Sequence, residues 1–192
     1  MIRWCRPPAG SVFASVISDM SLNFQWPENP FWDFSLAIYA EDGVPTVCLE
    51  LQERHGADVN LLLYVAWAGG LGHRLTSQDL AKIQDAVKRW HAGVVVPLRG
   101  LRSALKSDAM GAAPELAESI RSDIKMAELN AERAEQIMLS GVLEKLGRKG
   151  SGEPRPAAES NMRAYLERLG GTLDKRDSDG IGLIAEAACR PG

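Results

Sequence analysis

Residues 29–70 contain the stretch that decides the fold, which reads NPFWDFSLAIYAEDGVPTVCLELQERHGADVNLLLYVAWAGG. Asn29 is a good helix N-cap, and Pro30 suits the first helical position, where the N–H that proline lacks would have no partner. Glycines and short polar residues then separate the apolar runs from one another. The stretch therefore predicts three consecutive helices, over residues 30–39, 46–55 and 59–68.

The third of these helices is apolar on nearly every side. Its large apolar residues are Leu61, Leu62, Leu63, Val65 and Trp67. A helix of this kind has no polar face to turn toward water, so it belongs in the centre of a bundle. We therefore expect it to form the middle of the hydrophobic core.

A fourth helix is predicted after the glycine-rich turn that follows. Thr76 and Asp79 have the spacing of a capping box, in which two side chains satisfy each other's backbone N–H groups. Apolar residues then recur at helical spacing as far as His91. The predicted helix covers residues 78–91.

The next segment, residues 94–96, reads VVV and alone would favour a strand. The sequence offers no second strand to pair with it, and an isolated strand is not stable. We therefore interpret it as the approach to a fifth helix with Pro97 near its start. The five helices would form a compact bundle over residues 29–107.

A long helix is predicted from Pro114 to residue 146, because no further proline and only Gly141 interrupt that segment. At 1.5 Å per residue it would be roughly 50 Å long. This is longer than the bundle requires. Either the helix wraps the bundle, or its alanine-rich distal half contacts a partner.

The predicted fold class is all-α: a compact helical bundle with a long C-terminal helix and a small helical tail. We expect residues 1–28 to be disordered or, up to Met20, to precede the true start. The helical bundle domain is assigned to residues 29–146 and a linker to residues 147–160, which are rich in glycine, proline and charge. Residues 161–192 form the short helical tail.

Composition excludes several classes of protein. The net charge is −3, from 22 lysines and arginines against 25 aspartates and glutamates, which does not suit a nucleic-acid binder. No apolar run is long enough to span a bilayer. The three cysteines lie far apart and form no CxxC pair, so neither a disulfide framework nor a zinc site is indicated.

No recognised pattern of catalysis, metal binding or cofactor binding is present. The densest group of potential metal ligands lies between residues 41 and 58. It lacks both HExxH and the paired Glu-x-x-His of di-iron bundles, so we expect solvated helix ends and an ion pair at Arg54 or His55 there. Catalytic residues remain unknown, and no metal and no cofactor are predicted.

Two groups of residues are candidates for binding. Arg99 and Arg102 lie one helical turn apart, and with Arg74 they could hold a phosphate or carboxylate. The alternative is a solvated basic face. Phe31 and Trp32 are adjacent on a helix and cannot both point inward, so one of them is a candidate for a groove or an interface.

Several blocks of the sequence resemble a bacterial family of uncharacterised proteins, DUF2390. The resemblance covers residues 29–146 and is carried by FWDFSLAIYA, GADVNLLL, LTSQDL, WHAGVVVPLRGLRSALK and AELNAERAEQ. It implies a cytoplasmic helical domain and supplies no catalytic residue.

Two hypotheses for function follow from the sequence. The first is a non-catalytic interaction module that binds a protein partner or forms a homo-oligomer, without contact to nucleic acid or membrane. The alternative is an enzyme or small-molecule binder with an anion site built from the basic residues. A cavity with converging arginines would favour the second hypothesis, whereas a convex charged face would favour the first.

Overall fold

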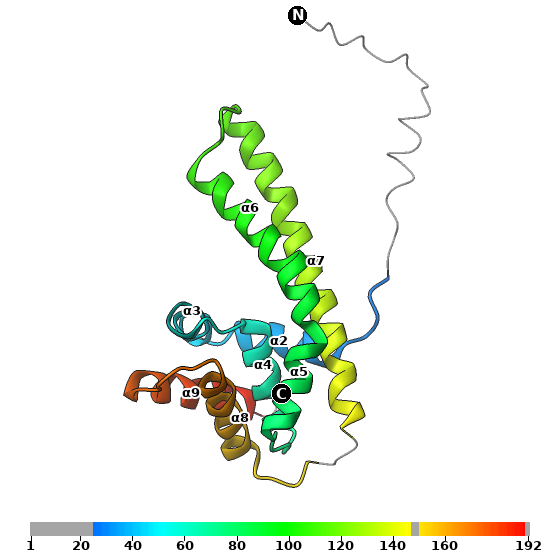
Figure 1. Ribbon diagram of the computed structural model, residues 1–192, viewed down its shortest axis with the longest axis vertical. Helices are drawn as coiled ribbons and strands as arrows, with labels where there is room; N and C mark the ends of the chain where they lie inside the picture. The colour runs from blue at the N-terminus through cyan, green and yellow to red at the C-terminus, as the bar shows by residue number, and fades with distance from the viewer. Residues whose placement is uncertain (1–24, 147–149, 191–192) are drawn as a thin grey trace, which may run out of the picture.

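The computed structural model describes residues 25–146 and 150–190, and these residues form helices with no β-strand (Figure 1). In chain order the elements are α2 (Pro30–Tyr39), α3 (Val44–His55), α4 (Val59–Gly70), α5 (Ser77–Trp90), the π-helical turn η1 (His91–Val95), α6 (Val96–Ser107), α7 (Pro114–Lys145), α8 (Pro154–Arg168) and α9 (Lys175–Ala188). The all-α fold class is confirmed. The predictions for residues 1–24 and 147–149 lie outside the described residues.

Capping interactions start α2, α4 and α5 where the sequence predicted. Asn29 Oδ1 accepts a hydrogen bond of 3.1 Å from the backbone N–H two residues later. Asp58 caps α4 in the same way at 2.9 Å. Thr76 and Asp79 form the predicted capping box, with both reciprocal bonds present. These bonds join residues two or three positions apart, so a local pattern suffices to predict them.

The valine-rich segment is helical and not a strand. α5, η1 and α6 follow one another without a break, and η1 is one turn of π-helix. Pro97 lies in the first turn of α6, and because it has no N–H it cannot bond back to the carbonyl groups of η1. The interpretation of residues 94–96 as the approach to a helix is confirmed. π-helical turns inside longer helices occur frequently at functional sites.

Helix α4 lies at the centre of the core, as its sequence predicted. Leu62 and Tyr64 are completely buried, and Leu63 is 3% exposed. Helices α2, α3, α7, α8 and α9 all contact α4. A helix with apolar residues all round thereby finds a protein neighbour on every side.

The C-terminal helices are part of this core, which differs from the expected linker and tail. α8 begins at Pro154, inside the predicted linker, and Met162 and Ile181 belong to the same buried cluster as α4. The two helices approach so closely that a Cβ added to Gly69 would lie 2.2 Å from the Cα of Ala158. This contact could not be predicted from the sequence, because small residues look alike in a linker and in a tight helix crossing.

Helix α6 and the first half of α7 form an antiparallel hairpin that extends away from the other helices (Figure 1). We call residues 96–130 the arm, and the remaining described helices the body. The predicted five-helix bundle over residues 29–107 therefore needs correction, because α6 packs on α7 and contributes no fully buried residue.

The second half of α7 also differs from expectation. It was a candidate for contact with a partner, yet it packs in the body, with Leu139 fully buried and Leu143 8% exposed. The first half is the one that projects. Ala131 is buried there as well, at 5% exposed.

Candidate functional site

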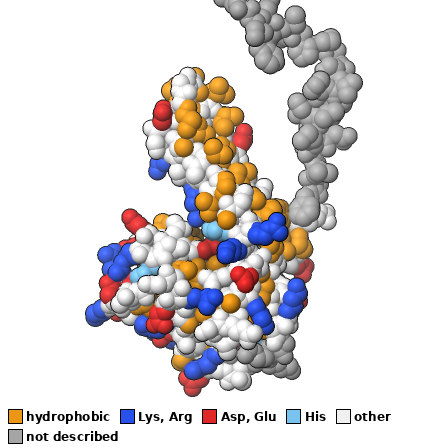
Figure 2. Space-filling model, in the orientation of Figure 1, with side chains coloured by type: hydrophobic (Ala, Val, Ile, Leu, Met, Phe, Trp, Pro, Cys, Tyr) orange, Lys and Arg blue, Asp and Glu red, His pale blue; other side chains and the backbone are white. Residues whose placement is uncertain are grey.

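The arm carries a large share of the exposed apolar surface. Seven of the thirteen large apolar side chains that stay exposed in the described residues lie on it, including Leu101 at 54% and Leu116 at 57%. Figure 2 shows hydrophobic side chains gathered along the arm. Helical spacing groups six of the arm's apolar residues, which we call the arm face: Leu98, Leu101 and Leu105 of α6, and Leu116, Ile120 and Ile124 of α7.

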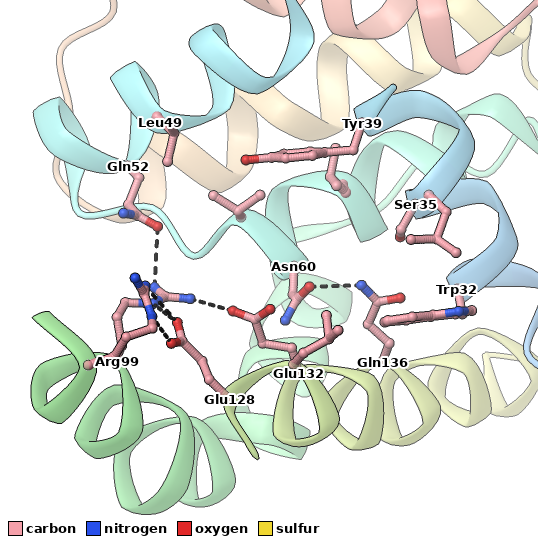
Figure 3. Close-up of a pocket in the computed structure, with 15 residues that line it drawn as sticks. Trp32, Ser35, Tyr39, Leu49, Gln52, Asn60, Arg99, Glu128, Glu132 and Gln136 are labelled. Atoms are coloured by element: carbon pink, nitrogen blue, oxygen red, sulfur yellow. Dashed lines mark hydrogen bonds and ion pairs between the residues drawn. The ribbon is translucent and has the colours of Figure 1, made fainter. Parts of the chain in front are cut away.

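A cavity of about 360 Å³ lies where the arm joins the body, among α2, α3, α4, α6 and α7 (Figure 3). One side of its lining is apolar and aromatic, with Trp32 and Tyr39 of α2. The other side is polar. The polar residues that line it are Ser35, Gln52, Asn60, Arg99, Arg102, Glu128, Glu132 and Gln136.

The two arginines at this cavity are already paired with carboxylates. Arg99 donates to Glu128 at 3.1 Å and to Glu132 at 2.7 Å, and Arg102 also donates to Glu128. Burial alone would raise the pKa of Glu128, but the hydrogen bonds from Arg102 and Arg99 outweigh it and lower that pKa. For Glu132 burial dominates, and its pKa is raised.

The predicted anion site is therefore not assembled. Arg99 and Arg102 lie side by side as expected, but acidic residues of α7 occupy their donors. Arg74 lies elsewhere, in the turn before α5, where its side chain packs near Gly152. The three arginines do not converge, and carboxylates neutralise two of them. They therefore do not offer the free donor groups that bidentate binding of an oxyanion requires.

The two aromatic candidates have different positions. Phe31 is completely buried, with its ring edge-on to Tyr64 at 5.1 Å. Trp32 is half-buried and lines the cavity. The Arg133 guanidinium lies 5.0 Å from the Trp32 ring centre and 4.8 Å from that of Trp26, so it is held between two aromatic rings.

A chain of buried amides leads from the cavity into the body. Asn60 Nδ2 donates to Glu135 Oε2 at 2.7 Å, and Gln136 Nε2 donates to Asn60 Oδ1 at 2.8 Å. An ionised carboxylate can only accept, so Glu135 determines the orientation of both amides. As a result Gln136 Oε1 is left as a buried acceptor without a hydrogen-bond donor, and the Ser35 hydroxyl is also unpaired.

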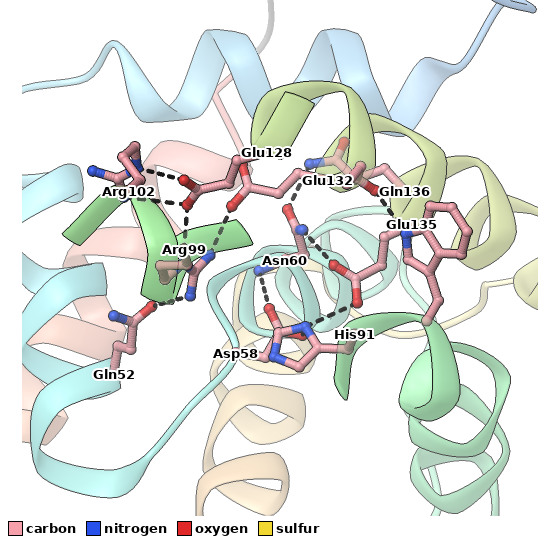
Figure 4. Close-up of polar contacts among 12 residues, drawn as sticks. Gln52, Asp58, Asn60, His91, Arg99, Arg102, Glu128, Glu132, Glu135 and Gln136 are labelled. Carbon is pink, nitrogen blue, oxygen red and sulfur yellow. Dashed lines mark hydrogen bonds and ion pairs between the residues drawn. The ribbon is translucent and has the colours of Figure 1, made fainter. Parts of the chain in front are cut away.

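At the far end of this chain, two carboxylates converge on one histidine (Figure 4). His91 Nδ1 lies 2.9 Å from Asp58 Oδ2 and 3.0 Å from Glu135 Oε1. The contacts with Asp58 and Glu135 raise the pKa of His91 to about 10. His91 begins the π-helical turn, Asp58 caps α4, and Glu135 comes from α7. Three elements therefore meet at this cluster.

Sequence reasoning missed the acidic residues that complete these contacts. Glu128, Glu132 and Gln136 recur at steps of four along α7, and Glu135 lies three positions after Glu132. This polar stripe lies in AELNAERAEQ and could have indicated the contacts from the sequence.

Arg54 was predicted to form an ion pair, and it does. It donates to Asp174 at 2.7 Å and to Asp177 at 2.5 Å, while His55 Nε2 lies 3.1 Å from Asp177. Both acids belong to the capping box of α9, so the contact ties α3 to α9. Its role is structural.

Comparisons with known proteins place the chain in one family. Within the described residues, no helix combines the length and the apolar character needed to cross a membrane. Neither the curated proteins nor the solved structures gave a match. The family described as "Protein of unknown function (DUF2390)" matches residues 30–139, more than half of the chain, and covers α2 to α6, the arm and most of α7. The chain is a member of the DUF2390 family.

Proposed function

We propose that this protein is a helical interaction module that pairs with a second copy of itself through the arm face. The observation that carries this proposal is the exposed apolar seam on a two-helix hairpin that projects from an otherwise well-packed body. Two helices cannot bury an apolar face that lies beside their shared groove. A second hairpin laid against it would complete a four-helix arrangement and cover both seams.

The charges beside the seam favour a second copy as the partner. Arg99 and Arg102 of α6 are paired within the chain, but Lys106 near the end of α6 and Glu115 in the first turn of α7 give the arm two further, opposite charges. A two-fold pairing that sets α6 of one copy beside α7 of the other brings these opposite charges together. Such rim charges contribute more to orientation than to affinity.

The expected affinity is modest. Three residues of the arm face are about half-exposed and three are already partly buried. Covering the exposed half of a large apolar side chain is worth about 1–1.5 kcal/mol and a partly buried one less, so the two copies together contribute at most roughly 12 kcal/mol. Association itself costs an estimated 4–15 kcal/mol. At the lower end of this cost about 8 kcal/mol remains, so the tightest dimer that we expect has a dissociation constant in the micromolar range.

Analytical ultracentrifugation of the full chain tests this proposal. We expect the wild type to move from monomer to dimer between about 1 and 200 μM, a range set by a micromolar dissociation constant. The double variant Leu101→Glu, Ile120→Glu should stay monomeric, because charges on the arm face would have to be buried.

Leu71→Glu is the matched control, since Leu71 is 49% exposed but lies in the turn after α4 and not on the arm. It should dimerise like the wild type. A wild type that remains monomeric at about 200 μM, or a Leu71 variant that loses the dimer equally, would refute pairing through the arm face.

A second candidate function is the binding of a small molecule in the cavity. The specific observation is that Gln136 Oε1 and Ser35 Oγ, both buried at its wall, lack partners. A ligand with an apolar body and an N–H donor would suit them better than the anion predicted from the sequence. Indole should give a saturation-transfer NMR signal that 1-methylindole, which lacks the donor, gives weakly. Equal signals would refute recognition by these acceptors.

A further inference from the structure

The cluster at the base of the arm places three potential metal ligands around one point. His91 Nδ1, Asp58 Oδ2 and Glu135 Oε1 all lie within 4.8 Å of one another. The two carboxylate oxygens approach the same ring nitrogen, at 2.9 Å and 3.0 Å. Donor atoms at right angles around an ion with bonds of roughly 2.1 Å are about 3.0 Å apart, so the spacing suits a shared cation.

The remaining oxygen of each carboxylate is held by a hydrogen bond from one residue, Asn60. Its backbone N–H donates to Asp58 Oδ1 at 2.9 Å, and its side-chain amide donates to Glu135 Oε2 at 2.7 Å. These bonds orient the other oxygens, Oδ2 and Oε1, toward His91 (Figure 4). Metal ligands in proteins are commonly oriented in this way by hydrogen bonds to their outer atoms.

The charges at the cluster are not balanced by the histidine. Nδ1 carries at most one proton, so it cannot satisfy both of the carboxylate oxygens that approach it. Asp58 Oδ2 contacts the nitrogen but receives no hydrogen bond, although the Asp58 side chain is only 10% exposed and Glu135 is fully buried. A buried carboxylate oxygen without a donor is costly, and it is aimed at the centre of the cluster.

We propose that His91, Asp58 and Glu135 bind a divalent first-row transition-metal ion, with water in the remaining positions. One imidazole nitrogen and two carboxylate oxygens suit Zn²⁺, Co²⁺, Mn²⁺ or Fe²⁺ better than Ca²⁺ or Mg²⁺, which favour oxygen alone. His91 is 23% exposed, which leaves a path for the ion to enter. The site is separate from the arm face, so it does not depend on dimer formation.

An ion at this position would link the start of α4, the π-helical turn and α7. The arm leaves the body at this junction. The proposed metal would therefore stabilise the base of the arm, and its open positions would face the exposed side of His91.

Cobalt titration of the chelator-treated full chain tests the site, because Co²⁺ bound to protein nitrogen and oxygen gives visible absorption bands. We expect saturation at one ion per chain in the wild type, competition by Zn²⁺, and no competition by equimolar Mg²⁺. Loss of a hydrogen-bond partner of a metal ligand typically lowers metal affinity roughly 10–100-fold. His91→Gln removes a ligand itself, so it should lower the affinity for Co²⁺ by more than this.

His73→Gln is the matched control, because His73 lies in the turn between α4 and α5 and is not part of the cluster. It should bind Co²⁺ like the wild type. Asp58→Asn provides a second variant that keeps a good N-cap on α4 while it removes a charged ligand. It should also weaken binding at least about tenfold, with the helical circular dichroism spectrum unchanged.

Three results would overturn the proposal. The wild type could fail to saturate with Co²⁺, His91→Gln could bind as tightly as the wild type, or His73→Gln could lose as much affinity as His91→Gln. Any of these results would mean that His91, Asp58 and Glu135 pair only with one another and bind no metal ion.

Discussion

The body and the arm are both built from amphipathic helices, but they bury their apolar residues to very different degrees. In the body, α4 is surrounded by neighbouring helices, and Leu62 is completely buried. In the arm, α6 has no fully buried residue, although Leu98, Leu101 and Leu105 repeat at helical spacing. An apolar stripe therefore indicates that a helix face needs cover. It does not say whether the same chain provides that cover.

The sharpest test of this contrast is the same substitution in both regions. Leu62→Ala in the body should lower the free energy of unfolding by roughly 2–5 kcal/mol, because it leaves a cavity in a packed core. Leu101→Ala in the arm should change it by no more than about 0.5 kcal/mol in the monomer. Urea unfolding at a concentration below dimer formation measures both. Equal losses would mean that the arm is packed as tightly as the body.

Glycines provide a second comparison of the two regions. Gly69→Ala should destabilise the protein by about 1–3 kcal/mol or more, because the new Cβ would collide with the backbone of α8 at Ala158. Gly100→Ala in α6 should stabilise the protein by roughly 0.5–1 kcal/mol, because alanine loses less backbone entropy than glycine when the helix forms. The new Cβ would meet no atom within 4 Å. Thermal unfolding distinguishes them. A stable Gly69 variant would show that α8 can dock without the close crossing.

The ion pairs between the two helices of the arm should have a smaller and pH-dependent effect. The pKa of Glu128 is lowered, since Arg102 and Arg99 outweigh burial. The pairing of Glu128 therefore stabilises the folded state at pH values above 4.5, the ordinary pKa of a glutamate. This stabilisation is lost as the pH falls below 4.5 and through the lowered pKa of the folded state.

Glu128→Gln should accordingly lower the free energy of unfolding by about 1 kcal/mol at pH 7, as expected for a partly exposed ion pair. At a pH low enough to protonate Glu128 in both the folded and the unfolded state, the substitution should have no measurable effect. Unfolding curves recorded from pH 7 down to pH 3 follow the difference between variant and wild type. A difference that stays constant with pH would assign the effect to packing.

The smallest expected effect lies at the cavity between the two regions. Ser35 is 6% exposed, and its hydroxyl has no hydrogen-bond partner. Ser35→Ala should therefore leave stability unchanged or raise it by up to about 1 kcal/mol, because an unpaired polar group is removed. A clear loss of stability in thermal unfolding would reveal a hydrogen bond in solution and would weaken the case for a ligand at this wall.

The candidate sites illustrate how far sequence reasoning reaches. It identified Arg99 and Arg102 as neighbours, because their spacing of three positions is a local property of a helix. It did not find that Glu128 occupies them, since that contact joins residues 26 positions apart. The cluster of Asp58, His91 and Glu135 was missed for the same reason, as Glu135 lies 44 positions from His91.

The sequence by itself determined where most of the helices begin and which one lies in the centre. Asn29, Asp58 and the Thr76–Asp79 box act within one turn, and the continuous apolar surface of α4 requires a buried position wherever its neighbours lie. Only the tertiary structure decided that α8 crosses α4 at Gly69, that α7 divides between body and arm, and which carboxylates meet His91. These outcomes depend on how helices that are distant in the chain are placed relative to one another. A local sequence pattern shows that a helix face must be buried, but it does not specify which distant segment packs against that face.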